Sequence, residues 1–190
     1  MNGDSAPTVL IVPGLRDHVA DHWQTHLAQR LQGARTVPRM DSAAPERLSC
    51  AAWVTALDRS LADIAGPVLL VAHSAGVAIV VHWAQHHARP IEAALLATPP
   101  DFQSPLPPGY PPLATFAGNG WIPLPRNRLP FRSIVAASAS DPLGRFDLVA
   151  ELAADWGSDR VDLGDVGHLN PASGFGEWPD AERLVRRLCD

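Results

Sequence analysis

Three residues of this chain, Ser74, Asp141 and His168, have the side chains of a nucleophile, an orienting carboxylate and a base. A serine hydroxyl is a weak nucleophile at neutral pH and needs an adjacent base to accept its proton. A carboxylate that holds the imidazole in one tautomer completes such a set. The three occur in the chain order Ser, Asp, His, which is the order found when each follows a different strand of one parallel sheet. This order predicts acyl-transfer chemistry on Ser74.

Ser74 lies in the segment Ala72-His73-Ser74-Ala75-Gly76, between an apolar run and a further apolar stretch with helical character. This is the order strand, sharp turn, helix, which exposes a serine at the edge of a sheet. The usual Gly-x-Ser-x-Gly pattern is met with Ala72 at its first position. The alternative is that Ser74 only caps a helix after a buried strand.

Asp141 is the preferred carboxylate because it follows a predicted strand, in Ser140-Asp141-Pro142. Asp165, three residues before His168, is the alternative that could orient the base. His168 lies in a glycine-flanked loop after the last predicted strand, whereas His73 is expected to pack or hydrogen-bond beneath the nucleophile. The other carboxylates fall on a predicted helix or within or before a strand: Asp147, Asp155, Asp159 and Asp162.

An oxyanion formed during acyl transfer needs two donors placed in advance. The amide of Ala75, directly after the nucleophile, is one candidate. The second is expected from the loop Pro13-Gly14-Leu15-Arg16 after the first strand, with the Leu15 amide as the choice.

Apolar runs bounded by turn residues predict the elements that hold these groups. The expected strands are 8–12, a weak edge strand at 36–38, 68–72, 91–97, 133–139 and 160–163; the expected helices are 21–31, 45–64, 75–87, 145–156 and 179–188. Because strands and helices alternate, the fold class is α/β: a mostly parallel sheet of about six strands with helices on both faces. We expect one domain over 1–190.

The segment 99–130 differs from the rest, because it holds 10 of the 19 prolines and several aromatic residues. Proline disfavours helix interiors and central strands, so the segment is expected to be ordered but irregular. It would cover the carboxyl edge of the sheet, where open α/β sheets bind ligands, with Trp121 as a pocket-lining candidate. The alternative is a loop that packs on the outside.

Composition excludes several other functions. The 15 cationic residues are all arginine and are scattered through a chain of net charge -5, which disfavours nucleic acid as a partner. Without lysine there is no Walker-type phosphate loop, Schiff base or Ser-Lys pair. With no long apolar run and no signal-peptide pattern, we expect a cytoplasmic protein without membrane association, in which Cys50 and Cys189 are reduced.

His18, His22 and His26 are spaced four residues apart, which on one helix would place three imidazoles on one face. That spacing could form a zinc site. His18 is expected to precede the helix, however, and no His-Glu-x-x-His pattern occurs, so solvated histidines are the preferred interpretation and no metal is expected.

Taken together, the motifs resemble those of the small serine hydrolases of the α/β-hydrolase superfamily, related to retinoblastoma-binding protein 9 and YdeN-type proteins. The resemblance rests on Val12-Pro13-Gly14, Asp21-His22-Trp23-Gln24, the Ser74 turn, Ser140-Asp141-Pro142, Gly167-His168-Leu169-Asn170 and Ser173-Gly174-Phe175-Gly176-Glu177-Trp178-Pro179. It implies a compact fold without a large cap domain, no metal or organic cofactor, and Ser74, Asp141 and His168 as the catalytic set. It also makes Trp23 and Trp178 structural or pocket-lining candidates.

We therefore expect a serine hydrolase that cleaves a small ester, thioester or amide through an acyl-enzyme. The alternative is a non-catalytic interaction module on the same fold, because fold alone does not establish activity. Retinoblastoma binding through a Leu-x-Cys-x-Glu motif is not supported, because Leu48-Ser49-Cys50-Ala51-Ala52 lacks the glutamate.

Overall fold

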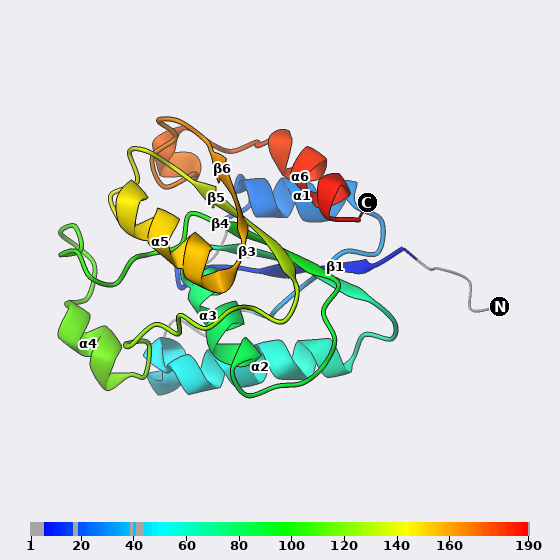
Figure 1. Cartoon of the computed structure of the whole chain (residues 1–190), viewed down its shortest axis with the longest axis horizontal. Helices are drawn as coiled ribbons and strands as arrows, with labels where there is room; N and C mark the ends of the chain where they lie inside the picture. The colour runs from blue at the N-terminus through cyan, green and yellow to red at the C-terminus, as the bar shows by residue number, and fades with distance from the viewer. Residues whose placement is uncertain (1–5, 17–18, 39, 41–43, 190) are drawn as a thin grey trace.

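The structure, a computed structural model, describes residues 6–16, 19–38, 40 and 44–189. Six parallel strands form one sheet in the order β2-β1-β3-β4-β5-β6 (Figure 1). The strands are β1 Thr8–Val12, β2 Arg35–Thr36, β3 Val68–His73, β4 Ala93–Ala97, β5 Arg132–Ala137 and β6 Asp159–Asp162. The helices are α1 Trp23–Arg30, α2 Cys50–Ala62, α3 Ala75–Ala84, α4 Leu113–Gly118, α5 Phe146–Trp156 and α6 Asp180–Cys189.

Two separate cores lie on the two faces of the sheet. In β3, Leu70 and Ala72 belong to the core beneath α2, α3 and α5, whereas Leu69 and Val71 belong to the core beneath α1 and α6 (Figure 1). Successive side chains of a strand point to opposite faces, so a central strand covered on both sides must be apolar throughout. All six residues of β3 are buried. The predicted fold class, a parallel α/β sheet with helices on both faces, is confirmed.

Gly76 allows α3 to begin close to the end of β1. A Cβ at this position would lie 2.2 Å from the Val12 carbonyl oxygen and 2.8 Å from that of Pro13. Any side chain here would force the helix away from the sheet. Gly76 therefore sets how closely the first turn of α3 approaches the loop that follows β1.

Several predicted boundaries differ from the structure. The predicted helix 45–64 is a short 3₁₀ helix, Pro45–Leu48, followed by α2, because Ser49 is extended and its Oγ accepts a hydrogen bond from the Ala52 amide, 3.3 Å away. An N-cap of this kind starts a new helix. The edge strand β2 ends at Thr36, before Pro38. Helix α3 ends at Ala84, shorter than predicted.

The segment 99–130 contains a helix, α4, that the proline content did not predict. It begins directly after Pro112, where a helix tolerates the residue that lacks an amide donor. Trp121 anchors the end of the segment, since its Nε1 donates to the Leu48 carbonyl at 2.6 Å and its own carbonyl accepts from His82 Nε2 at 3.1 Å. Burial keeps the pKa of His82 below its usual value, which favours the neutral ring.

Within the described residues, no helix combines the length and apolar character needed to span a membrane.

Candidate active site

Ser74 lies at a strained turn between β3 and α3. Its backbone has φ 57° and ψ -129°, a region that non-glycine residues rarely occupy and that costs roughly 1–3 kcal/mol. Its amide donates to the Ala97 carbonyl of β4 at 3.0 Å, which fixes the turn against the neighbouring strand. Ser74 makes no side-chain capping hydrogen bond to α3, so the helix-cap alternative does not describe its role.

Ser74, His168 and Asp141 form one hydrogen-bonded series. Ser74 Oγ lies 2.8 Å from His168 Nε2, and His168 Nδ1 lies 2.9 and 3.0 Å from the two Asp141 oxygens. The side chains of His168 and Asp141 are only 7% and 2% exposed. Because a carboxylate only accepts, Nδ1 carries the proton and Nε2 is left to accept from the serine hydroxyl.

Asp141 is held in place by the loop after β5. One of its oxygens, Oδ1, also accepts from the Leu143 amide at 2.9 Å. Asp165, the alternative carboxylate, is exposed, and the contacts of the His168 ring nitrogens are with Ser74 and Asp141.

The loop that carries His168 is fixed by side chains from two other segments. The Gly167 amide donates to Ser140 Oγ at 3.0 Å, and the His168 amide donates to Ser173 Oγ at 3.1 Å. Gly167 and Leu169 both have positive φ, at 56° and 48°. This backbone holds its shape through these contacts, because it lies outside any regular element.

The loop predicted to form the oxyanion site lies against Ser74. A Cβ on Gly14 would be 3.2 Å from Ser74 Cβ, and Leu15 and Ala75 line the same cavity as Ser74. Gln24 donates from Nε2 to the Val12 and Val71 carbonyls at 3.3 and 3.1 Å. It thereby fixes the strand end from which this loop leaves. The motif Asp21-His22-Trp23-Gln24 did not indicate this role.

A cavity of about 480 Å³ opens above Ser74. This volume is within the usual range for small-molecule sites. Most of its wall is apolar, and the segment 99–130 supplies much of it. This favours the prediction that 99–130 covers the site over the alternative that it is a loop packed on the outside. The apolar lining residues include Leu15, Leu48, Phe102, Leu106, Phe116 and Leu143. At its mouth, Arg16 donates to the Gly109 carbonyl at 2.6 Å and lies 3.8 Å above the Tyr110 ring.

The three tryptophans proposed as pocket-lining residues do not line this cavity. Trp121 packs behind Phe102 and Phe116, and Trp23 packs edge-on against Trp178 with ring centroids 4.9 Å apart. Both Trp23 and Trp121 are almost completely buried. Trp121 belongs to the core on one face of the sheet, and Trp23 and Trp178 belong to the core on the other face. Large aromatic rings bury much apolar surface in such cores.

Two of the three histidines suggested as a metal site, His22 and His26, make other contacts in the structure. His22 Nδ1 accepts from the Gln24 amide at 3.2 Å, and His26 pairs with Asp21 at 3.1 Å. His18 lies outside the described residues. Among residues 6–16, 19–38, 40 and 44–189, no group of three His, Cys, Asp or Glu side chains is arranged to hold a metal ion.

Cys50, the first residue of α2, has a thiol that could also act as a nucleophile. Burial raises the pKa of its thiol to about 12, so it is protonated at neutral pH and unreactive.

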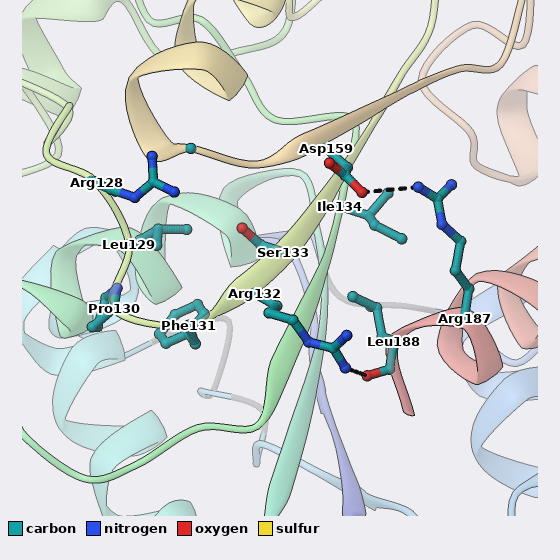
Figure 2. Close-up of a pocket in the computed structure, with 11 residues that line it drawn as sticks. Arg128, Leu129, Pro130, Phe131, Arg132, Ser133, Ile134, Asp159, Arg187 and Leu188 are labelled. Carbon is teal, nitrogen blue, oxygen red and sulfur yellow. Dashed lines mark hydrogen bonds and ion pairs between the residues drawn. The ribbon is translucent and has the colours of Figure 1, made fainter. Parts of the chain in front are cut away.

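A second cavity of about 440 Å³ lies at the opposite, amino-terminal edge of β5 (Figure 2). Three arginines line it: Arg128, Arg132 and Arg187. Arg132 donates to the Leu188 carbonyl near the end of α6, at 2.6 Å, and Arg187 pairs with Asp159 at 2.9 Å (Figure 2). Cations at the carboxyl ends of helices offset the helix dipole, and this accounts for the charge here.

Several solved structures are similar to this chain. The chain is similar to a protein described as a YdeN-like hydrolase from Pectobacterium atrosepticum, with 27% identity, a TM-score of 0.79, and coverage of 96% of this chain and 90% of that one. The ydeN gene product of B. subtilis is 19% identical, with a TM-score of 0.74 and coverage of 96% and 98%. An esterase domain from Rhodothermus marinus is 16% identical, with a TM-score of 0.67 and coverage of 98% and 89%.

No curated protein matches the sequence. The structural likeness identifies the fold as a compact α/β-hydrolase fold. A family profile described as serine hydrolase matches residues 9–187, nearly the whole described chain. The family resemblance inferred from the motifs is therefore confirmed, and the chain belongs to the serine hydrolase family.

Proposed function

We propose that this protein cleaves small carboxylic esters through an acyl-enzyme on Ser74, with His168 as the base and Asp141 as the carboxylate that orients it. The observation that carries the proposal is the continuous series from Ser74 Oγ to His168 Nε2 at 2.8 Å and from His168 Nδ1 to Asp141 at 2.9 Å. Membership of the serine hydrolase family supports it.

In the first half-reaction, His168 Nε2 accepts the proton of Ser74 as Oγ attacks the substrate carbonyl carbon. The tetrahedral oxyanion accepts hydrogen bonds from the amides of Ala75 and Leu15, the two donors proposed for it. The His168 imidazolium then gives its proton to the leaving alcohol as the bond from carbon to that oxygen breaks. The acyl group remains on Ser74.

In the second half-reaction, a water molecule gives a proton to His168 Nε2 as its oxygen attacks the acyl carbon. The tetrahedral intermediate collapses, Ser74 leaves with the proton from His168, and the carboxylic acid is released. Asp141 stays ionised and stabilises the imidazolium in both halves.

The apolar wall beside Ser74 supports an acyl group of medium length. Leu106, Phe116 and Leu143 would bury methylene groups that an acetyl group does not have, at about 0.8 kcal/mol for each buried methylene. We therefore expect p-nitrophenyl butyrate and hexanoate to be cleaved with higher kcat/KM than the acetate.

The decisive experiment is labelling with a fluorophosphonate probe, followed by mass spectrometry of the modified peptide. We expect the label on Ser74 in the folded protein and its loss in Ser74→Ala and His168→Ala. Label that persists in both variants, or that falls on another serine, would overturn the assignment. Ser104→Ala, in the segment 99–130, is the matched control and should label normally.

A further inference from the structure

His73, the last residue of β3, lies directly before the nucleophile and lines the floor of the cavity. It is 4% exposed. Its ring centroid lies 4.9 Å from that of His168 and 5.8 Å from that of Trp23, which meets it edge-on. The ring is therefore packed between the rings of His168 and Trp23.

His73 hydrogen-bonds to the main chain of His168. Its Nε2 lies 2.9 Å from the His168 carbonyl oxygen. A carbonyl oxygen can only accept, so His73 Nε2 carries the proton and donates it. A residue adjacent to the nucleophile is thus bonded to the peptide unit of the base, across 95 residues of sequence.

This contact completes the fixation of the His168 backbone. The amide of His168 is bound by Ser173 Oγ at 3.1 Å, and its carbonyl by His73. The next residue, Leu169, has φ 48°, which a non-glycine residue keeps only when its surroundings hold it there. Without the donor on His73, the peptide unit between His168 and Leu169 would have a buried, unsatisfied carbonyl beside a strained residue.

We propose that His73 is a positioning residue, whose Nε2–H donation to the His168 carbonyl sets the distance from the base to Ser74. This inference rests on the proposed function of the same site. Because His73 and Ser74 are consecutive, any movement of the strand end moves the nucleophile and the base together, and the 2.8 Å contact between Ser74 Oγ and His168 Nε2 is kept.

Two variants separate donation from packing. His73→Gln places a neutral amide donor near the position of Nε2 but removes the ring. His73→Phe keeps a ring against Trp23 but removes the donor. We expect His73→Phe to lower kcat for p-nitrophenyl butyrate by roughly 10- to 100-fold with little change in KM, as expected when reacting groups are displaced by a fraction of an ångström to about an ångström. His73→Gln should stay within a few-fold of the parent.

The second measurement does not depend on activity. In protein with ¹⁵N-labelled histidine, the Nδ1 proton that His168 donates to Asp141 should give a downfield NMR signal in the parent and in His73→Gln, and a shifted or broadened one in His73→Phe. The Tm of both variants is measured beside their kcat. If His73 had a purely structural role, the loss of kcat in each variant would parallel its loss of Tm.

The outcomes are distinct. If His73→Phe retains activity and the His168 signal while His73→Gln loses them, the ring packs and does not position, and the inference is wrong. If the parent protein is not labelled by fluorophosphonate, the proposed function fails, and the NMR signal alone decides the positioning role. An unchanged His168 signal in His73→Phe overturns the inference in either case.

Discussion

At the scale of single residues, the site depends on hydrogen bonds between buried side chains. Asp141 accepts from His168 Nδ1 and from the Leu143 amide, and both its side chain and that of His168 are nearly excluded from water. In such an environment a hydrogen bond to an ionised group is about twice as strong as a neutral one. The orientation of the imidazole therefore follows from Asp141.

We predict that Asp141→Asn lowers kcat by roughly 1,000- to 10,000-fold, because the amide would donate to Nδ1 and place the His168 proton on Nε2, the wrong tautomer for a base. Steady-state hydrolysis of p-nitrophenyl butyrate measures this. Asp165→Asn changes an exposed carboxylate and should leave kcat unchanged. A large loss in Asp165→Asn with activity kept in Asp141→Asn would show that the carboxylate was wrongly assigned.

At the scale of elements, the position of Ser74 depends on how closely α3 approaches β1. The absence of a Cβ at Gly76 permits contact with the Val12 and Pro13 carbonyls. Ser74 is held between this helix and β4, to which its amide donates. The turn can therefore keep its strained φ of 57°.

We predict that Gly76→Ala destabilises the protein by about 3 kcal/mol and reduces fluorophosphonate labelling, because a Cβ 2.2 Å from the Val12 carbonyl forces α3 outward. Gly118→Ala in α4 is the matched control. A Cβ there would meet nothing within 4 Å, so this change should be neutral or stabilise by about 0.4–1 kcal/mol. Denaturant unfolding gives both values, and equal effects of the two changes would exclude the steric explanation.

At the scale of the whole molecule, Asp101 joins the start of the segment 99–130 to the loop that leads from Asp141 into α5. Its carboxylate accepts from the amides of Gln103 and Ser104, at 2.7 and 2.8 Å, and from that of Arg145 at 2.9 Å. Burial by itself would raise the pKa of Asp101, but the hydrogen bonds from Ser104, Arg145 and Gln103 outweigh it and lower the pKa. The charged form is the one that the folded state stabilises.

A carboxyl group whose pKa is lower in the folded than in the unfolded chain stabilises the fold above its unfolded pKa, and this contribution is lost as the pH falls through the folded pKa. We therefore predict that Asp101→Asn lowers Tm at pH 7 and that the difference from the parent narrows below the ordinary Asp pKa of about 3.8. Calorimetry at a series of pH values measures this. A Tm difference that stays constant down to pH 2.5 would contradict the linkage.

The sequence by itself predicted the sheet and, approximately, where its strands end, because apolar runs and turn residues are local signals. Val68 to Ala72, and the runs ending at Ala97 and Ala139, predict parallel strands whose carboxyl ends share one edge, and in the structure β5 ends at Ala137. The structure brings Ser74, Asp141 and His168 within hydrogen-bond distance at that edge, as their positions after strands predicted. Their catalytic roles stay predictions until the labelling experiment is done.

Only the tertiary structure decided which side chains meet. The contact of His73 with the His168 carbonyl joins residues 95 positions apart, and no local pattern indicates it. Trp121 lies behind the cavity wall and not in it, because it packs against Phe102 and Phe116 and its Nε1 donates to the Leu48 carbonyl of a distant segment. Periodicity shows which face of a strand or helix is apolar, but the neighbours of a buried side chain depend on how distant segments pack, and that is decided by the whole chain at once.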